Sequence, residues 1–410
     1  MGAHSEEEWL EQIRRALKAT ETDKALAAAE AAIAEHPDSV ALRDTLITAL
    51  EASGRHGLAL KHARLNALGH IAALEGTRPP RQGAPAPSRP GKLILISGYF
   101  YSGSSAVLDF IRGLSGVRKW PPSGEMRLVK FPGGLDDLSK RFARHDGLRQ
   151  QDPLAFYQHL VGAKYTGNEK PGKTKWKTVN RNSIRNIRNP DYADYLRACL
   201  HGFRELEQFG QGGGADFDAF EAFLATIVRD CLAAAQHQLG AEILAIDQVV
   251  TAWRMPIARY LPPAAFVVVH RDPRDQFLDA NTALAKTGRR VFSAEEFATL
   301  YRNRRRIADE NIPLLEERYG HSFFRTSFED FVIDHDRVGA EILQALNLEG
   351  HARLAANFDP SYSIRNIGKH RGALAEADLR TLETLLPEFL DDRAGAPGTT
   401  PTPTSAPISA

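Results

Sequence analysis

Residues 92–106, KLILISGYFYSGSSA, carry the clearest fold signal in the chain. Leu93–Ser97 is a short apolar run of the kind that parallel sheets bury on both faces. A glycine-rich turn from Gly98 to Gly103 follows, and the helical pattern AVLDFIRGL begins at Ala106. A strand, a glycine turn and a helix in this order predict one unit of an α/β protein.

Four further short runs extend this pattern along the chain. They are Val117–Trp120, Ile243–Asp247, Ala265–His270 and His321–Thr326, the last of them before a helix expected near Glu329. Strands that alternate with helices predict a parallel sheet flanked by helices. Because ligands of such sheets bind beyond the carboxyl ends of the strands, functional residues are expected just after these runs.

The first part of the chain has a different pattern. Residues 6–73 look helical throughout and repeat at 33 to 34 residues. The matching pairs are Ala25 and Ala59, Ala29 and Ala63, Leu17 and Leu50, and Ile13 and Leu46. This spacing resembles two tetratricopeptide repeats, and the alternative is a plain four-helix bundle or docking domain. Two repeats bury little surface, so we expect them to pack on the next domain or on a second subunit.

Composition divides the chain into four parts. We expect a helical repeat region over 1–76, a proline-rich linker over 77–91, an α/β domain over 92–393 and a disordered tail over 394–410. The predicted fold class is therefore α/β, with a central parallel sheet preceded by a small all-α region.

Charge and composition exclude several classes. The chain has 52 basic and 51 acidic residues, and its net charge of +1 argues against a globally basic nucleic-acid or membrane-surface binder. No apolar run approaches the ~18 residues of a membrane span, and the start MGAHSEEEWL does not resemble a signal peptide. Two cysteines, Cys199 and Cys231, favour a reducing compartment and give no zinc-binding pattern. We expect a cytoplasmic protein.

The turn after the first predicted strand has the spacing of a phosphate loop. Residues 98–105, GYFYSGSS, fit G-x-x-x-x-G-K-S/T except that Ser104 stands at the lysine position. Glycines let backbone N–H groups face a phosphate, and the following helix adds its positive end. Without the lysine, metal-assisted triphosphate hydrolysis is disfavoured. A loop that holds one 5′-phosphate and a merely tight turn both stay open.

Three later segments join this loop. They are HRDPRD (270–275), SFEDFV (327–332) and IGKHRG (367–372). In this order the four segments resemble the sulfotransferase family that uses 3′-phosphoadenosine 5′-phosphosulfate, over about residues 92–380. The loop looks like the family's 5′-phosphosulfate loop, and VVVHRDPRD looks like its 3′-phosphate motif.

The resemblance implies a P-loop-type fold and sulfuryl transfer to a hydroxyl or amine without a metal. The donor-binding residues that it implies are Ser102, Gly103, Ser104 and Ser105 for the 5′-phosphate and sulfonate, Arg271 for the 3′-phosphate, and Lys369 and Arg371 over the nucleotide.

Three positions depart from the family pattern. Tyr101 stands where the family has a lysine or arginine before Ser-Gly, and Asp279 stands where it has a serine. The lysine often found after the third strand is replaced by Asp247-Gln248. A carboxylate beside a 3′-phosphate is electrostatically unfavourable unless a cation intervenes. Either other cations substitute, or donor binding is weakened or lost.

A candidate base follows the second predicted strand. Sulfuryl transfer needs a group that takes the acceptor's proton. Residues 123–127, SGEMR, resemble the G-E-x-x-R segment of the tyrosylprotein-type members, one residue short. Glu125 is the candidate base, and Arg127 would orient it or contact the acceptor. The alternative is a surface ion pair in a loop.

A basic stretch lies between the predicted strands. Residues 164–188 hold eight Lys and Arg against Glu169 alone, with Tyr165 and Trp176 interleaved. It is either a solvated loop or an anion-binding segment over the donor or an acidic acceptor. Nucleic acid is disfavoured because no recognised nucleic-acid module accompanies the charge.

The sequence is thus compatible with two alternative functions. The first is a metal-independent sulfotransferase that acts on a hydroxyl-bearing acceptor, a saccharide or another small or polymeric molecule. The second is an interaction protein on a sulfotransferase-like scaffold with a degenerate donor site, contacting a protein partner or itself through residues 6–73. A nucleotide or sugar kinase is a third reading, against which the missing lysine counts.

Overall fold

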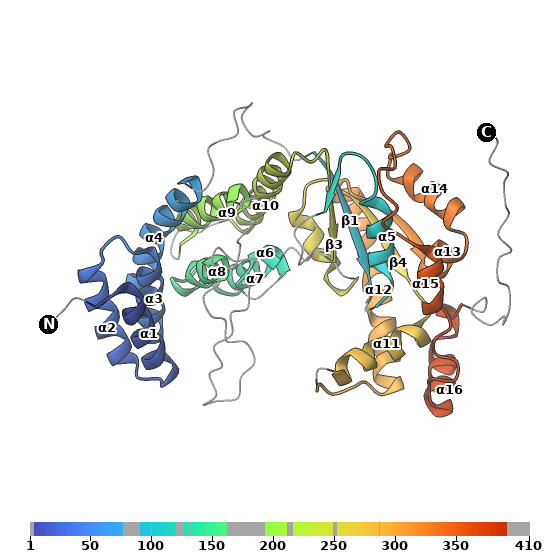
Figure 1. Cartoon of the computed structure of the whole chain (residues 1–410), viewed down its shortest axis with the longest axis horizontal. Coiled ribbons are helices and arrows are strands. Elements are labelled where there is room, and N and C mark those ends of the chain that lie inside the picture. The colour runs from blue at the N-terminus through green and yellow to red at the C-terminus, as the bar shows by residue number, and fades with distance from the viewer. Residues whose placement is uncertain are drawn as a thin grey trace.

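The computed structural model has a central five-stranded sheet of parallel strands in the order β2-β3-β1-β4-β5 (Figure 1). The strands are β1 (Lys92–Gly98), β2 (Val117–Lys119), β3 (Ile243–Asp247), β4 (Ala265–His270) and β5 (Ser322–Ser327). Each of them lies within one residue of its predicted bounds. The predicted α/β class with a central parallel sheet is confirmed.

The structure describes residues 4–76, 91–99, 101–119, 127–130, 133–161, 193–210, 216–248, 252–286 and 288–391. Most of the predicted linker, the basic stretch 164–188 and the predicted tail 394–410 lie outside these ranges. Among the helices that fall within them, none combines the length and apolar character that a membrane span needs.

Both faces of the sheet are covered by helices because β1 alternates apolar side chains to either side. Ile94 and Ile96 belong to a core with α5 (Ser104–Ile111), α13 (Phe328–Ile333) and α14 (His335–Ala345). Leu93 and Leu95 belong to a second core on the other face. The helices of that face are α10 (Phe217–Leu239), α12 (Ala294–Tyr319) and the 3₁₀ segment η3 (Ala252–Tyr260).

The remaining helices lie around these layers. In the part of the chain after β4, α11 (Pro273–Lys286) and α16 (Glu376–Leu385) share a small core with the first half of α12. The shorter elements nearby are α15 (Pro360–Ser363), η4 (Ile364–Asn366) and η5 (Pro387–Phe389). Between β2 and β3 lie α6 (Arg127–Lys130), α7 (Leu135–His145), α8 (Gln151–Val161), α9 (Ala193–Glu205) and η2 (Leu206–Phe209).

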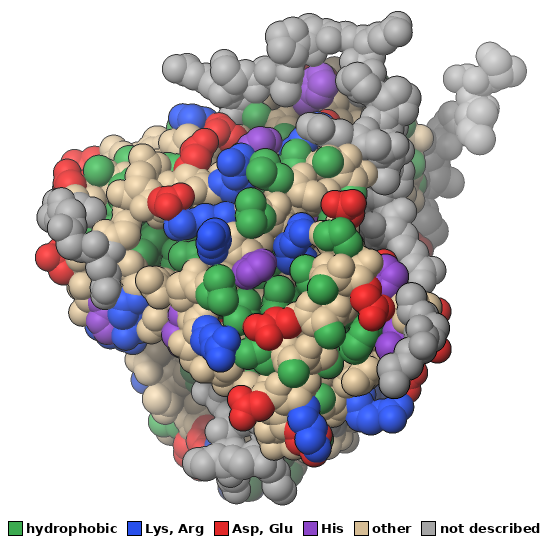
Figure 2. Space-filling view, turned by 90° about the vertical axis from the view of Figure 1, so that its left-hand side faces the viewer, with side chains coloured by type: hydrophobic (Ala, Val, Ile, Leu, Met, Phe, Trp, Pro, Cys, Tyr) green, Lys and Arg blue, Asp and Glu red, His purple; other side chains and the backbone are tan. Residues whose placement is uncertain are grey.

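Four helices form the N-terminal region, as predicted. They are α1 (Glu6–Lys18), α2 (Thr22–Glu35), α3 (Val40–Ala52) and α4 (His56–Gly76). The eight side chains at the repeating positions are all buried. Figure 2, which faces the side of the molecule where these helices lie, shows basic, acidic and hydrophobic side chains mixed over the surface. The helices are present, whereas their assignment as tetratricopeptide repeats and as a separate domain stays a prediction.

The N-terminal helices are joined to the rest of the chain through α4, which packs on α8 and α9. A buried polar network reinforces this seam. The Tyr157 hydroxyl donates to Asp44 Oδ1 at 2.7 Å, and Asn66 Nδ2 donates to the same oxygen at 2.8 Å. His70 Nε2 lies 3.2 Å from Asp44 Oδ2. A buried carboxylate is stable only when such donors surround it, so this network fixes how α3 and α4 meet α8.

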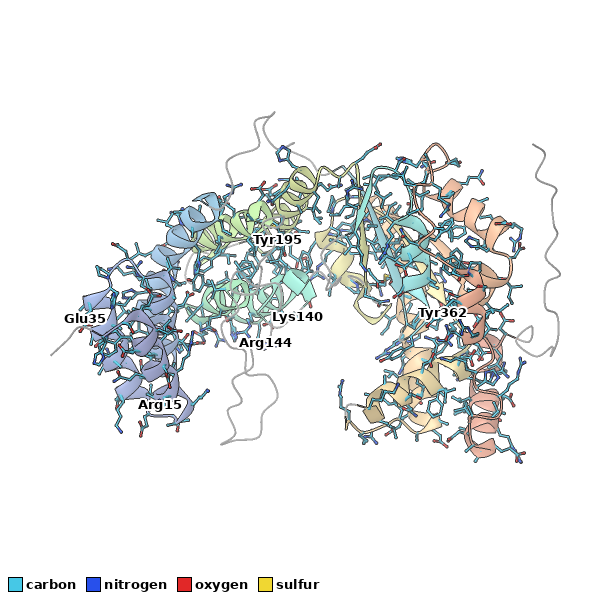
Figure 3. All side chains as sticks on the ribbon, viewed as in Figure 1. Arg15, Glu35, Lys140, Arg144, Tyr195 and Tyr362 are labelled. Atoms are coloured by element: carbon cyan, nitrogen blue, oxygen red, sulfur yellow. The ribbon has the colours of Figure 1, made fainter. Side chains whose placement is uncertain are left out.

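Tyr157→Phe removes one donor from the buried Asp44 carboxylate and should destabilise the fold by about 1–3 kcal/mol. The matched control is Tyr362→Phe, because Tyr362 is exposed on α15, on the side of the molecule away from the N-terminal helices (Figure 3). Urea unfolding measures both. Equal unfolding midpoints for the two variants would contradict the structural role of the network.

Candidate functional site

The loop after β1 lies at the centre of the sheet, between the carboxyl ends of β3 and β4. Its turn is tight, since the Ser102 N–H donates to the Tyr99 carbonyl at 2.8 Å. Tyr101 and Gly103 adopt the left-handed backbone conformation, with φ of 52° and 82°. A Cβ at Gly103 would lie 2.2 Å from the Phe328 ring, and one at Gly98 would lie 1.9 Å from Ser102 Oγ. Both glycines are therefore needed for this path of the chain.

The predicted donor residues of this loop lie at the start of α5. Ser102 is buried, and its hydroxyl has no hydrogen-bond partner among the described residues. Ser104 accepts a hydrogen bond from Gln248 Nε2 at 2.5 Å and donates to Asp247 Oδ1 at 3.4 Å. Ser105 is exposed. The first-turn N–H groups of α5 and its positive end are directed at the loop, which suits an anion.

Ser104 is thus held by the two residues that replace the lysine expected after the third strand. Asp247 pairs in register with Ile96 of β1, which brings its carboxylate beside the loop. The sequence indicated the missing lysine but not the contact, because nothing in the local pattern relates residues 143 or 144 positions apart.

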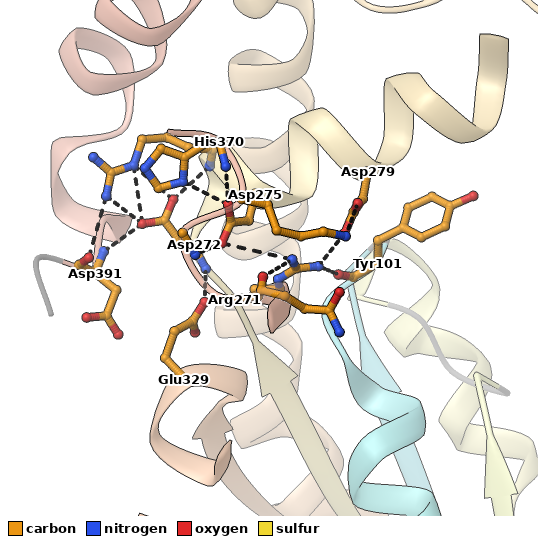
Figure 4. Close-up of polar contacts among 12 residues, drawn as sticks. Tyr101, Arg271, Asp272, Asp275, Asp279, Glu329, His370 and Asp391 are labelled. Carbon is orange, nitrogen blue, oxygen red and sulfur yellow. Dashed lines mark hydrogen bonds and ion pairs between the residues drawn. The ribbon is translucent and has the colours of Figure 1, made fainter. Parts of the chain in front are cut away.

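Arg271 is a buried cation that contacts three parts of the site. It follows β4, is only 5% exposed and lies over the Phe328 ring at 5.2 Å. Its Nη1 donates to the Tyr101 carbonyl and to Asp279 Oδ2, each at 2.8 Å, and its Nη2 donates to the Asn366 carbonyl at 2.5 Å (Figure 4). One side chain therefore joins the loop, α11 and the C-terminal turn.

Lys369 reaches the same carboxylate. Its Nζ donates to Asp279 Oδ1 at 2.9 Å, so each oxygen of Asp279 takes one cation. The side chains of Asp279 and Lys369 are 22% and 34% exposed, which places this ion pair at the rim of the site. Cations do flank the carboxylate that the sequence marked as unfavourable, and they are Arg271 and Lys369.

Asp275 holds the C-terminal turn onto α11. Its carboxylate accepts the backbone N–H groups of Gly368 and His370 at 2.7 and 2.8 Å, and the His370 ring Nδ1 lies 2.8 Å from it. Burial tends to raise the pKa of this carboxyl, but the bonds from His370 and the charge of Arg271 outweigh it and lower the pKa. Asp275 was not among the predicted site residues.

A second pair of carboxyl groups supports the start of α11. Asp272 accepts three hydrogen bonds from the Arg274 guanidinium, at 2.7 to 3.2 Å, and the N–H of Asp391 at 3.1 Å. Glu329 Oε1 accepts the N–H of Asp272 at 3.1 Å, and Glu329 Oε2 has no partner among the described residues. Burial raises the pKa of Glu329 to about 7, only partly offset by the Asp272 N–H.

The other predicted site residues are Arg371, Glu125 and Arg127. Arg371 is exposed in the C-terminal turn. Glu125 lies outside the described residues, and Arg127 begins α6 without a described side chain. One sequence signal was missed: Asp272, Asp275 and Asp279 are three and four residues apart, a spacing that places them on one side of a helix.

No group of three or more His, Cys, Asp or Glu side chains that could hold a metal ion is found within the described ranges. Arg271 and Lys369 are the two cations that meet at Asp279, and the positive end of α5 is the further feature at this edge of the sheet that suits an anion.

Comparison with known proteins finds the sulfotransferase family model matching residues 174–352, which is less than half of the chain. The match includes the HRDPRD and SFEDFV segments but neither the glycine loop nor the IGKHRG segment. A search of curated proteins finds no match.

Solved structures that share similarity are sulfotransferases at low identity. The sulfotransferase domain of a Synechococcus olefin synthase is 16% identical with a TM-score of 0.35, covering 74% of this chain and 97% of that one. A sulfotransferase from Mycobacterium tuberculosis is 12% identical with a TM-score of 0.36, covering 80% and 83%. A sulfotransferase domain from the curacin biosynthetic pathway is 12% identical with a TM-score of 0.32, covering 72% and 97%. TM-scores this low carry no weight for function.

Gly103→Ala should unfold the loop or the protein because the new methyl group overlaps the Phe328 ring. Gly54→Ala is the matched control, since Gly54 has a similar φ of 76° and nothing within 4 Å of its Cβ position. The control should lose about 1–2 kcal/mol from left-handed strain alone, and Gly103→Ala more than about 3 kcal/mol. Urea unfolding gives both values, and equal losses would contradict the close contact with Phe328.

Glu329→Gln should flatten the dependence of stability on pH. The folded pKa of about 7 lies above the ordinary value of 4.5, so the stability from the neutral carboxyl is complete below pH 4.5 and is lost as pH rises through 7. The amide keeps the acceptor for Asp272 and cannot ionise. In thermal unfolding from pH 4.5 to 8, the unfolding midpoint of the variant should rise relative to that of the wild type as the pH increases.

The control for this measurement is the exposed Glu317→Gln, which should follow the wild type at every pH. A constant difference between Glu329→Gln and the wild type across the range would show that the pKa of Glu329 is the same in the folded and the unfolded state, and would overturn the assignment.

Proposed function

We propose that this protein is a sulfotransferase that moves a sulfuryl group from 3′-phosphoadenosine 5′-phosphosulfate to an acceptor hydroxyl. The family match supports sulfotransfer, and the resemblance of the four segments supports the donor. The single observation that carries the proposal is Arg271, a buried cation at the end of β4 bonded to the carbonyl of Tyr101 in the phosphate-type loop. A cation and a helix N-terminus at one sheet edge suit a nucleotide with charge at two positions.

The loop fits the 5′ end of such a donor. Its glycines bring backbone close to the ligand, and the buried Ser102 hydroxyl has no hydrogen-bond partner among the described residues. The α5 N-terminus would face the 5′-phosphate, with Ser104 and Ser105 in its first turn. On the 3′ side, Arg271 and Lys369 would be the cations, with the exposed Arg371 over the nucleotide.

The proposed reaction is an in-line displacement at sulfur. The acceptor oxygen forms a bond to sulfur, while the bond between sulfur and the bridging phosphate oxygen breaks. The acceptor's proton passes to a base, and the products are a sulfate ester and adenosine 3′,5′-bisphosphate. The loop and the cations stabilise the charge that develops on the leaving phosphate. None of these steps requires a metal.

Glu125 is the proposed base, with Arg127 orienting it or contacting the acceptor. The support is positional, since α6 begins at Arg127, shortly after β2 at the edge of the same sheet. We further propose a polar, hydroxyl-bearing acceptor such as a saccharide. We also propose a cytoplasmic setting, because only two cysteines in a chain of 410 residues favour a reducing compartment.

One observation favours the second candidate, an interaction protein whose donor site is degenerate. Both proposed 3′ cations already contact a carboxylate of the chain itself, Asp279. In that case the N-terminal helices would bind a protein partner or a second copy, and the nucleotide would not bind.

Isothermal titration with adenosine 3′,5′-bisphosphate separates the two candidates. A sulfotransferase should bind this product, and Arg271→Gln should weaken binding at least tenfold because it releases the Tyr101 carbonyl of the phosphate-type loop and leaves the Asp279 carboxylate without one of its two cations. Arg302→Gln, at an exposed arginine of α12, is the control. No heat and no thermal shift at millimolar nucleotide would exclude the donor site and leave the interaction protein.

Glu125→Ala tests the base. The variant should bind the bisphosphate as tightly as the wild type and lose at least about a hundredfold in sulfuryl transfer, because general base catalysis contributes about that much. Transfer is measured as bisphosphate release with a panel of hydroxyl acceptors, with Glu317→Ala as the control. Full activity in Glu125→Ala would show that another group takes the proton.

A further inference from the structure

Asp279 fills the place between the two cations that the proposed donor site would offer to a 3′-phosphate. Its two oxygens bond to Arg271 Nη1 at 2.8 Å and to Lys369 Nζ at 2.9 Å, one cation each (Figure 4). A phosphate bridging two cations would use the same donors in the same way. A carboxylate of the chain is therefore an internal substitute for an external anion.

Arg271 cannot reorient to bind a phosphate in addition to Asp279. Its side chain is buried, packed over the Phe328 ring and held by the carbonyls of Tyr101 and Asn366. The Nη1 and Nη2 atoms are both used in these bonds and in the bond to Asp279. The Nε atom has no hydrogen-bond partner among the described residues, but it is buried as well. A phosphate would thus gain little from Arg271 unless Asp279 moved aside.

The local charge leads to the same conclusion. Two cations, Arg271 and Lys369, face two carboxylates, Asp279 and Asp275, the latter 3.9 Å from Arg271 Nη2. A phosphate would meet a site that is already neutral, and it would stand beside a displaced Asp279 carboxylate. A hydroxyl, in contrast, can donate to Asp279 without displacing it or changing the charge.

We propose that Asp279 removes the requirement for a 3′-phosphate, so that adenosine nucleotides with a free 3′-hydroxyl bind about as well as the bisphosphate. This inference rests on the proposed nucleotide site. The substrate class becomes a nucleoside 5′-phosphosulfate with or without the 3′-phosphate, and Asp279 is the residue that determines this specificity.

The experiment compares adenosine 5′-monophosphate with adenosine 3′,5′-bisphosphate by isothermal titration, in the full-length wild type and in Asp279→Asn. The asparagine keeps the size of the side chain and removes its charge. In the wild type, the two dissociation constants should agree within about threefold. In Asp279→Asn, the bisphosphate should bind at least tenfold more tightly relative to the monophosphate, because the two cations become available.

Asp309→Asn is the matched control, since Asp309 pairs with Arg325 at 2.5 Å in another ion pair. It should leave the ratio of the two dissociation constants unchanged, and thermal unfolding checks that each variant is folded.

The outcomes separate this inference from the proposed function. Wild-type protein that prefers the bisphosphate by tenfold or more, or an unchanged ratio in Asp279→Asn, overturns the role of Asp279 while the nucleotide site stands. If neither nucleotide binds to the wild type or to Asp279→Asn, the proposed function and this inference are overturned together.

Discussion

The parallel pairing of β1 with β3 on one side and β4 on the other is the constraint on which the site depends. Because all five strands point the same way, their carboxyl ends meet at one edge, and the chain must return through helices after each strand. The loop after β1, Asp247 at the end of β3 and Arg271 after β4 become neighbours for this reason alone. Helices then bury both faces, so the polar groups of the site are confined to that edge.

Neutralisation of buried charge sets the detailed arrangement at this edge. Arg271 and Arg274 would be costly at the end of a buried strand without partners. The chain supplies Asp272 just before α11, Asp275 and Asp279 on α11, and backbone carbonyls from the loop and the C-terminal turn. The result is a network in which the charges of Arg271 and Arg274 are paired without a ligand, whereas Arg271 Nε, Glu329 Oε2 and the Ser102 hydroxyl have no hydrogen-bond partner among the described residues.

Local patterns were sufficient to predict the five strands and the N-terminal helices. The strands β1, β3 and β4 are short apolar runs with clear ends, and the N-terminal helices follow from small and aliphatic residues at helical spacing. The glycine loop and Arg271 were recognisable because each lies directly after a strand. These signals are contained in windows of about ten residues.

Contacts between distant segments could not be predicted in this way. Lys369 meets Asp279 across 90 residues, His370 meets Asp275 across 95, and Asn66 meets Tyr157 across 91. No periodicity connects such positions, since only the packed fold determines which polar groups become neighbours. The sequence therefore marked Asp279 as unusual but could not identify its two partners.

The seam between α4 and the helices α8 and α9 has a consequence for how the chain acquires its structure during synthesis. The helices α8 and α9 leave the ribosome only after β1, α5 and β2. The surface on which α4 packs is therefore not yet synthesised when the first strands of the sheet emerge. Domains commonly fold in order from the N-terminus. Here the first four helices cannot reach their final packing until translation has passed Glu205, and their apolar surface is available to chaperones until then.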